Sequence, residues 1–281
     1  MSYFHILRQS KKIAGAILIG NIFFGGLALA QTPDQAHATD PAKAKAKAPA
    51  EAGSFPVGPG SLSGIWLNAE YKGSAKHPPR ELTIRTSDGQ PPPLLPAAAA
   101  LLDKRLAEAD KGDVFAGTTS ACLPGGVPAM MFGALYPIQI LETPGQVTFL
   151  FEEQNHFRIV RLGGTHPSDP DPSYMGDSIG HWEGDTLVVD TVGLNDKTTL
   201  DLVGTPHTEA LHVVERYRRI SPSKIEVRVT IDDPGAFSKT WETRGSYKLT
   251  EPGTHIQEYV CENNRNAPDA EGHMSFMPPA K

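Results

Sequence analysis

KIEVRVTID, residues 224–232, has the strict alternation of apolar and polar side chains that is typical of a half-buried β-strand. The preceding segment ALHVVERYRRI, residues 210–220, alternates in the same way. Ser221-Pro222-Ser223 lies between the two segments and is suited to a tight turn. The whole stretch therefore predicts an antiparallel hairpin with one buried face. In its second strand, that face consists of Ile225, Val227, Val229 and Ile231.

The same pattern recurs along most of the chain after residue 60. Residues 146–162 predict a second hairpin that turns at Gln154-Asn155, and residues 179–191 predict a third that turns at Glu183-Gly184-Asp185. Further strands are predicted at 63–68, 81–86 and 136–142, and residues 240–249 and 255–263 predict a last hairpin. A single helix is predicted at 96–109, with Pro96 in its first turn and Leu101, Leu102 and Leu106 on one side. About ten strands joined mostly by short turns must close or fold over to protect their edges. The sequence therefore predicts a mostly β fold, either an antiparallel up-and-down barrel or a strongly bent sandwich, with one short helix.

Composition and charge exclude several classes of protein. Of the 281 residues, 39% are hydrophobic and 21% are charged, which is the balance of a folded protein in water. The 27 Gly and 25 Pro leave little room for an all-helical fold. A formal net charge of −6 would not attract a nucleic-acid backbone, so no nucleic-acid partner is predicted.

Residues 1–30 have the features of an export signal. A basic start with Arg8, Lys11 and Lys12 precedes an apolar run from residue 13 to residue 30, which ends in the small residues that signal peptidase accepts. Cleavage after Ala30 would change the formal charge from −6 to −9. The alternative is an uncleaved membrane anchor, for which 18 residues is near the lower limit. We expect a periplasmic or secreted protein with no stable membrane insertion after cleavage.

The rest of the chain divides into a linker and one domain. Residues 31–60 are rich in Ala, Pro and Lys and have few apolar side chains to bury, which predicts a disordered linker. Residues 61–281 are predicted to form a single β domain. The sequence makes no prediction about its oligomeric state.

Two patterns resemble known proteins. Ser63-Gly64-Ile65-Trp66, at the entry of the first strand, resembles the Gly-x-Trp opening of lipocalin-like or calycin-like barrels, which implies that the indole closes one barrel end. The block from Gly176 to Thr191, which contains Gly-His-Trp-Glu-Gly-Asp-Thr-Leu-Val-Val-Asp, resembles a family of secreted bacterial β-rich proteins known only as uncharacterised. Cys122-Leu-Pro-Gly, residues 207–211 and residues 214–217 share this resemblance. That resemblance covers most of residues 61–262. It implies the domain extent and secretion, but no reaction.

Three polar residues are candidates for acid–base chemistry. His207 and Glu209 occupy positions i and i+2 of an extended segment, so their side chains point to the same side. His166 lies in GGTHPSDPDPSY, a polar loop longer than a simple connection requires. If that loop folds over the barrel mouth, the three could converge as acid, base and orienting group, or could bind a metal. The alternative is that all three are solvated loop or edge residues.

A second set of residues is predicted to bind a small molecule. Trp66, Tyr174 and Trp182 could form an aromatic pocket at the barrel mouth, or could pack in the core. Glu215 shares the face of apolar neighbours and needs a partner, for which we predict Arg161, because Arg161 shares the strand face of Phe157 and Ile159. This pair could hold the polar end of a ligand or act as a structural clasp.

Motifs for common cofactors are absent from the sequence. No Gly-x-Gly-x-x-Gly, phosphate loop, His-Glu-x-x-His, Cys-x-x-Cys or Gly-x-Ser-x-Gly occurs, so no cofactor is predicted. The function predicted from the residues is binding of a small apolar or aromatic compound, with cofactor-independent lyase, isomerase or hydrolase activity as a possible addition. The alternative is a non-catalytic ligand-binding protein or a structural protein of the envelope.

Cys122 and Cys261 are the two cysteines of the chain. An exported chain enters an oxidising compartment, where two cysteines within reach are normally bridged. We therefore predict a disulfide between them. The alternative is two buried free thiols.

Overall fold

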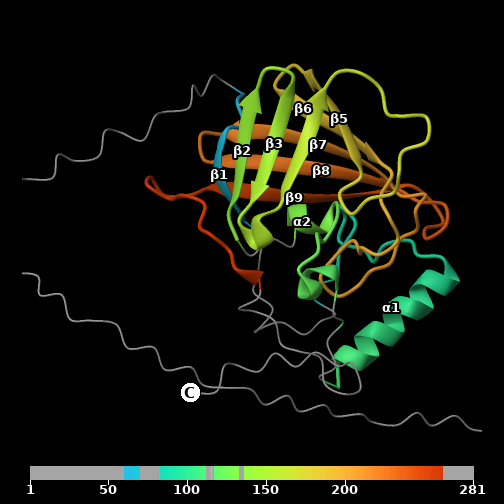
Figure 1. Ribbon diagram of the computed structural model, residues 1–281. Coiled ribbons are helices and arrows are strands. Elements are labelled where there is room, and N and C mark those ends of the chain that lie inside the picture. The colour runs from blue at the N-terminus through green and yellow to red at the C-terminus, as the bar shows by residue number, and fades with distance from the viewer. Residues whose placement is uncertain are drawn as a thin grey trace, which may run out of the picture. The chain divides into compact units, whose positions relative to one another are not determined.

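The computed structural model describes residues 60–69, 81, 83–111, 115, 117–132 and 136–261. The predicted export signal and all but the last residue of the predicted linker lie outside these ranges. The described residues form a closed barrel of nine strands with helical segments and long connections around one end (Figure 1). The mostly β fold with one longer helix confirms the predicted fold class.

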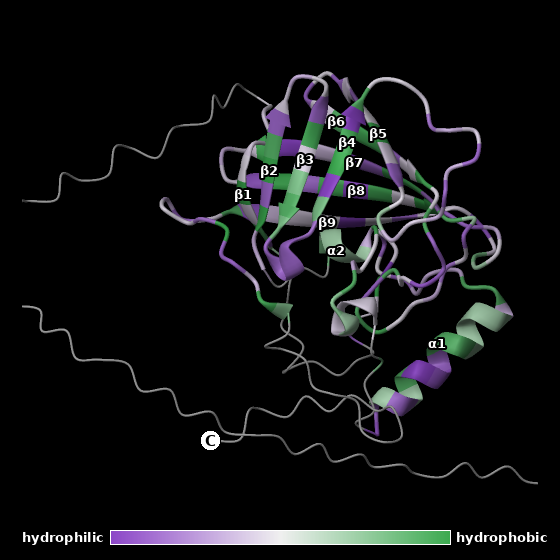
Figure 2. Ribbon diagram, viewed as in Figure 1, coloured by the Kyte–Doolittle hydropathy of each residue, from purple (hydrophilic) through white to green (hydrophobic). Residues whose placement is uncertain are grey.

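The nine strands follow one another around the barrel in chain order, and β1 closes it by pairing with β9. The strands are β1 (Gly64–Asn68), β2 (Ile138–Thr143), β3 (Gln146–Phe151), β4 (Phe157–Leu162), β5 (Asp177–Glu183), β6 (Thr186–Val192), β7 (His212–Ser221), β8 (Lys224–Asp232) and β9 (Trp241–Leu249). The predicted hairpins at β3–β4, β5–β6 and β7–β8 are confirmed. Along β8, hydrophobic and hydrophilic residues alternate (Figure 2), and the apolar side chains are buried.

One strand pair departs from the expected antiparallel order. β4 and β5 are parallel, and their register contains only two residue pairs, Arg161 with Ile179 and Leu162 with Gly180. The connection between them, residues 163–176, is long enough to permit this, because a parallel neighbour requires a crossover of a dozen or more residues. This crossover loop contains the predicted candidate His166.

Two of the predicted strands are not strands. The described part of residues 81–86 lies beside β9 but forms no ladder of backbone hydrogen bonds with it. Ser87, the next residue, donates one backbone hydrogen bond to the Glu242 carbonyl. Residues 255–261 form no hairpin with β9. They lie instead beside the 3-10 turn η4 (Glu153–Asn155), where the Asn155 side chain bonds the backbone of Tyr259.

Helix α1 (Pro96–Ala109) has the bounds that the sequence predicts. Leu102 and Leu106 are buried, and they pack with Val203. Leu101, which was expected on the same side, is 40% exposed. Leu102 and Leu106 are four positions apart and lie on the same side of the helix, whereas Leu101 lies on another side. The apolar face of the helix is therefore narrower than predicted. No helix in the described ranges is long and apolar enough to cross a membrane.

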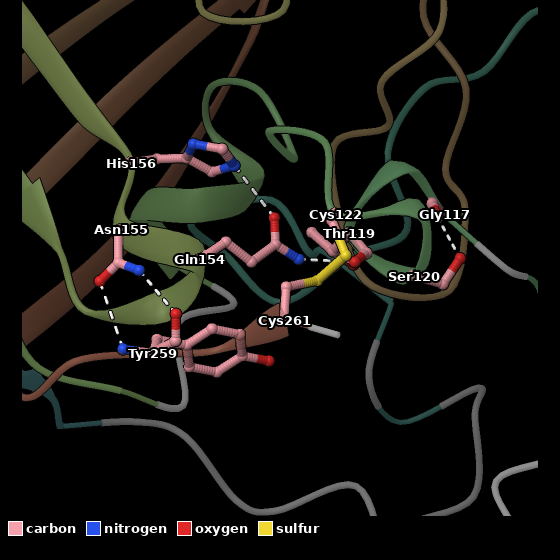
Figure 3. The surroundings of a disulfide bond; sticks show 9 residues. All are labelled: Gly117, Thr119, Ser120, Cys122, Gln154, Asn155, His156, Tyr259 and Cys261. Atoms are coloured by element: carbon pink, nitrogen blue, oxygen red, sulfur yellow. Dashed lines mark hydrogen bonds between the residues drawn. A yellow bond between two sulfur atoms is a disulfide. The ribbon is translucent and has the colours of Figure 1, made fainter. Parts of the chain in front are cut away.

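The predicted disulfide between Cys122 and Cys261 is present (Figure 3). Their Cα atoms are 5.9 Å apart and their sulfur atoms 2.04 Å apart. Cys122 follows the 3-10 helix η3 (Thr118–Ala121), and Cys261 ends the described part of the chain after β9. Gln154 adds a second tie nearby, because its amide donates to the Thr119 carbonyl at 2.5 Å.

Large side chains fill the inside of the barrel. Trp66, Tyr217, Tyr247, Phe149 and Phe151 are among the largest buried residues. Trp66 donates its indole N–H to the Leu62 carbonyl at 2.8 Å, and the Arg219 guanidinium lies 5.2 Å from the centre of its ring. The indole therefore packs in the core, which was the alternative to its predicted role in a ligand pocket.

Candidate functional site

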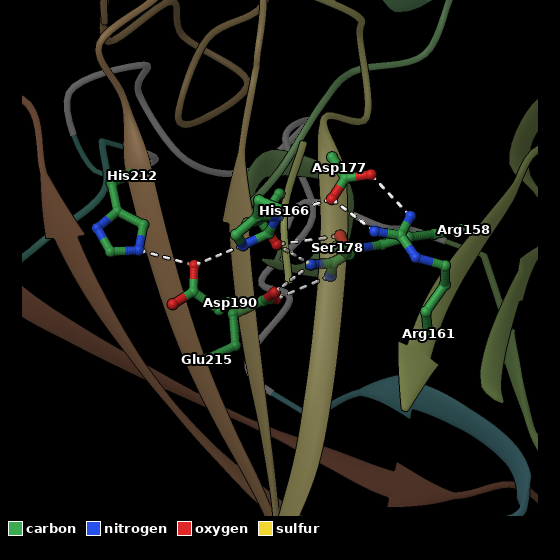
Figure 4. A network of polar contacts seen from close by, with 9 residues as sticks. Arg158, Arg161, His166, Asp177, Ser178, Asp190, His212 and Glu215 are labelled. Carbon is green, nitrogen blue, oxygen red and sulfur yellow. Dashed lines mark hydrogen bonds and ion pairs between the residues drawn. The ribbon is translucent and has the colours of Figure 1, made fainter. Parts of the chain in front are cut away.

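A buried polar network crosses the inside of the barrel between β4 and β7 (Figure 4). Glu215 is 0% exposed, and the side chain of Arg158 is 1% exposed. The guanidinium donates Nη1 to Glu215 Oε1 at 3.1 Å and Nη2 to Oε2, and the Tyr217 hydroxyl donates to Oε1 at 2.6 Å. Arg158 also donates to the hydroxyls of Ser178 at 3.1 Å and Thr191 at 2.7 Å. Because these groups satisfy one another, the network forms a structural clasp without any ligand.

Burial and charge set the protonation states of this clasp. Burial raises the pKa of Tyr217 well above its usual value, and the adjacent Glu215 raises it further. Burial alone would lower the pKa of Arg158, but Glu215 reverses this effect, and the pKa is raised. The tyrosine therefore remains a hydrogen-bond donor and the arginine remains a cation.

The predicted partner of Glu215 was wrong. Arg161 points to the outside of β4, whereas Arg158 points inward and forms the ion pair. The prediction assumed that Phe157 and Ile159 face the core, but these side chains are 61% and 43% exposed. Since side chains alternate along a strand, choosing the wrong buried face exchanged the two arginines.

A second polar network lies on the outer face of the same strands (Figure 4). Arg161 binds Asp177 through two hydrogen bonds of 2.7 and 2.9 Å. His166 reaches from the crossover loop to both Asp177, at 2.6 Å from Nδ1, and Asp190, at 3.1 Å from Nε2. His212 lies 2.8 Å from the same oxygen of Asp190. His166 therefore fastens the crossover loop to β5 and β6 beside the short parallel seam.

Hydrogen bonds in the outer network stabilise the charged form of Asp177. The hydrogen bonds of Arg161 are the largest cause that lowers the pKa of Asp177, followed by those of His166. An imidazolium can donate to both carboxylates at once, whereas a neutral imidazole can donate to only one. No group of three or more His, Cys, Asp or Glu within the described ranges is arranged to hold a metal ion.

The structure gives His166, His207 and Glu209 separate surroundings. His207 is buried, with Nε2 at 2.7 Å from the Thr198 hydroxyl and Nδ1 at 2.9 Å from the Thr208 carbonyl. Burial lowers the pKa of His207. Glu209 is exposed. Among the described residues, no hydrogen bond joins any two of these three side chains. Their roles as acid, base and orienting group stay predictions.

The predicted aromatic set is also dispersed. Trp182 is 37% exposed near the end of β5, and Tyr174 is partly buried in the crossover loop. Trp66 lies in the barrel core.

A groove of about 520 Å3 lies along β9 where β1 has ended. Two backbone hydrogen bonds mark the ends of this stretch, from Ser87 to the Glu242 carbonyl at 2.7 Å and from Ala69 to the Ser246 carbonyl at 2.8 Å. Residues 243–245 line the groove between them. Four apolar side chains from three separate segments contribute to its wall: Ile84, Phe132, Leu200 and Leu202.

Phe132, in helix α2 (Ala129–Phe132), packs directly on β9 beside this groove. A Cβ added to Gly245 would lie 2.5 Å from its ring. Glycine at 245 therefore lets the ring approach the strand and form an apolar surface beside the strand backbone.

Five charged residues line the groove, and four of them interact with other protein groups. Asp201 accepts backbone N–H groups, the one from Ile84 at 2.8 Å. Asp88 accepts the Thr86 hydroxyl, which is the largest cause that lowers its pKa. Glu81 and Arg85 also have interaction partners. The fifth charged residue is Arg244, for which the described part of the chain contains no ion pair or side-chain hydrogen bond.

None of the predicted site residues lines the described part of this groove. The groove is assembled from residues 81–89, α2, residues 200–202 and β9, and each segment alone has an ordinary sequence. Arg244 lies at an outward position of a predicted strand, but Glu242 and Lys248 do as well, so the sequence alone does not single it out.

Comparison with models of known families, with curated proteins and with solved structures gives no significant match to this chain. The resemblance to secreted bacterial β-rich proteins therefore stays a prediction.

Proposed function

We propose that this chain is an exported β-barrel protein that binds a small, largely apolar or aromatic molecule in the groove along β9. The groove itself carries the proposal. Its volume of about 520 Å3 lies in the range of small-molecule sites, and its wall combines apolar side chains with a few polar groups.

The filled barrel supports the groove as the binding place. The inside contains large aromatic side chains and the Arg158–Glu215 clasp, and these groups satisfy one another. A ligand inside the barrel would have to displace them. The groove requires no such displacement.

Binding, rather than catalysis, is the function that the groove supports. Its described lining contains no histidine, and the oxygens of Asp201 accept hydrogen bonds from Ile84, Val203 and Thr205. A general acid or base must have a free position within reach of its substrate.

Export is part of the proposal and is supported by the Cys122–Cys261 disulfide, which is typical of oxidising compartments. The intact mass of the protein recovered from the periplasm or medium should correspond to a chain that begins at Gln31. A full-length product in the membrane would contradict export.

A neutral fluorescent probe, N-phenyl-1-naphthylamine, tests the groove without favouring either charge. We expect its fluorescence to rise on binding and Leu202→Arg to weaken binding about tenfold, because a cation then replaces an apolar contact. Leu101→Arg on α1 is the matched control, since Leu202 is 41% and Leu101 is 40% exposed. Thermal unfolding checks that both variants fold.

Equal effects of the two substitutions would refute the groove as the binding site. Absence of probe binding to the wild-type protein would favour the alternative, a structural protein of the envelope.

A further inference from the structure

We infer that the ligand of the groove is an organic anion whose charged end binds Arg244 and whose apolar body lies against Phe132 and Leu202. This inference rests on the proposed function and adds the chemical class of the ligand. A carboxylate, sulfonate or phosphate on an apolar body has this chemistry.

The first argument is the availability of charge in the groove. Asp201 and Asp88 are engaged by donors of the protein, and Glu81 and Arg85 have partners. Arg244 is exposed, and no ion pair or side-chain hydrogen bond engages it within the described ranges. The charge that the groove offers to a ligand is therefore positive.

The second argument is the row of arginines to which Arg244 belongs. In the strand register Arg216 of β7 faces Arg228 of β8, and Arg228 faces Arg244 of β9, all on the outer surface. Like charges directly opposite each other destabilise a sheet. Arg216 has an ion pair with Glu183, and Arg228 has a long contact of 3.6 Å with Glu226.

An anion at the Arg244 end of the row would relieve this repulsion. Neighbouring strands are about 4.8 Å apart, so the guanidinium groups of Arg228 and Arg244 can approach one anionic group together. The mature chain has a formal charge near −9 in this interpretation, so a local basic row stands out against the overall charge.

The third argument is the wall of the groove beside Arg244. Phe132 packs on the inner side of Gly245, whereas Arg244 points outward, and both line the groove at the edge of β9 beyond the end of β1; Leu202 is exposed on the same groove. An apolar body that continues from the bound anion would cover both side chains. An inorganic anion would leave them uncovered, so an organic anion fits the groove better.

The test compares three probes of one shape by calorimetry: 2-naphthoate, neutral 2-naphthamide and cationic 2-naphthylmethylamine. We expect naphthoate to bind the wild-type protein about fivefold more tightly than the amide, the size of an exposed ion pair, and the amine to bind most weakly. This preference should fall as ionic strength rises.

Arg244→Gln should abolish the preference for naphthoate, and Arg244→Lys should restore part of it. Lys248→Gln is the matched control, because it removes the same charge from the same exposed face of β9 without lining the groove. N-phenyl-1-naphthylamine should bind Lys248→Gln as it binds the wild-type protein.

Two failures can be distinguished. Three results would overturn the anion inference: equal binding of naphthoate and the amide, tightest binding of the amine, or a preference for naphthoate that survives Arg244→Gln. In each case, binding of the neutral probe would still support the groove proposal. If neither the neutral probe nor any naphthalene compound binds, both proposals are wrong.

Discussion

Replacing Glu215 by Gln removes the counter-charge of an arginine that has no access to water. The Arg158 side chain is 1% exposed, and Glu215 accepts three hydrogen bonds, two from Arg158 and one from Tyr217. A glutamine has one oxygen, so at least one of these donors would face an N–H group. Breaking a buried pair from one side destabilises by about 3–5 kcal/mol, and we expect a loss of that size.

The double variant Arg158→Met with Glu215→Leu should be less harmful than Glu215→Gln alone. It removes both charges, and the hydroxyls of Ser178 and Thr191 can still bond each other at their present 3.0 Å. The Tyr217 hydroxyl then lacks an acceptor, which costs about 1–3 kcal/mol.

Chemical denaturation with the disulfide intact measures both effects as changes in the free energy of unfolding at constant m-value. Arg161→Met is the matched control, because that arginine is an exposed partner of Asp177 and should matter by less than about 1 kcal/mol. A loss below 1 kcal/mol for Glu215→Gln, or a double variant less stable than the single one, would refute the clasp.

Three further predictions concern stability. Replacing Cys122 and Cys261 by Ser should lower the free energy of unfolding by about 4–5 kcal/mol, because the disulfide closes a loop across 139 positions and restricts the unfolded chain. Equal denaturation midpoints of the variant and the oxidised protein would contradict this. Burial lowers the pKa of His207 in the folded protein below its usual 6.5. The neutral imidazole therefore contributes to stability above pH 6.5, and this contribution is lost as the pH falls through the pKa of the folded protein. Between pH 7 and pH 5, denaturation should show a larger loss of unfolding free energy for the wild-type protein than for His207→Asn. Gly126→Ala should destabilise by about 1–3 kcal/mol more than Gly145→Ala, since both glycines have φ near +80° but only at 126 would a Cβ lie 2.7 Å from a neighbouring side chain; similar melting temperatures would show that the site can relax.

Much of the fold could be predicted because its signals are local. The alternation in β8 and the turn residues at 221–223 are properties of neighbouring residues, and both were confirmed. The bounds of α1 followed from Pro96 and the apolar stripe. The disulfide followed from a count of two cysteines and the predicted compartment.

The errors arose where a local pattern was compatible with two arrangements. In β4 both faces carry apolar residues, and only the surrounding strands decide that Phe157 is exposed and that Arg158 meets Glu215. The parallel pairing of β4 and β5 was missed for the same reason, because a polar loop of that length can lead to a parallel or an antiparallel neighbour.

The sequence by itself determined that this protein is mostly β, in a barrel or a strongly bent sandwich, where three of its hairpins turn, where its helix lies and which cysteines are bridged. Each of these depends on residues close together in the chain or on the absence of another choice. Only the tertiary structure decided which arginine lies inside, how His166 fastens the crossover loop, and that β9, α2 and two distant loops enclose a groove beside Arg244. These features depend on contacts between segments far apart in the chain, and the periodicity of a single strand carries no information about which segments will meet.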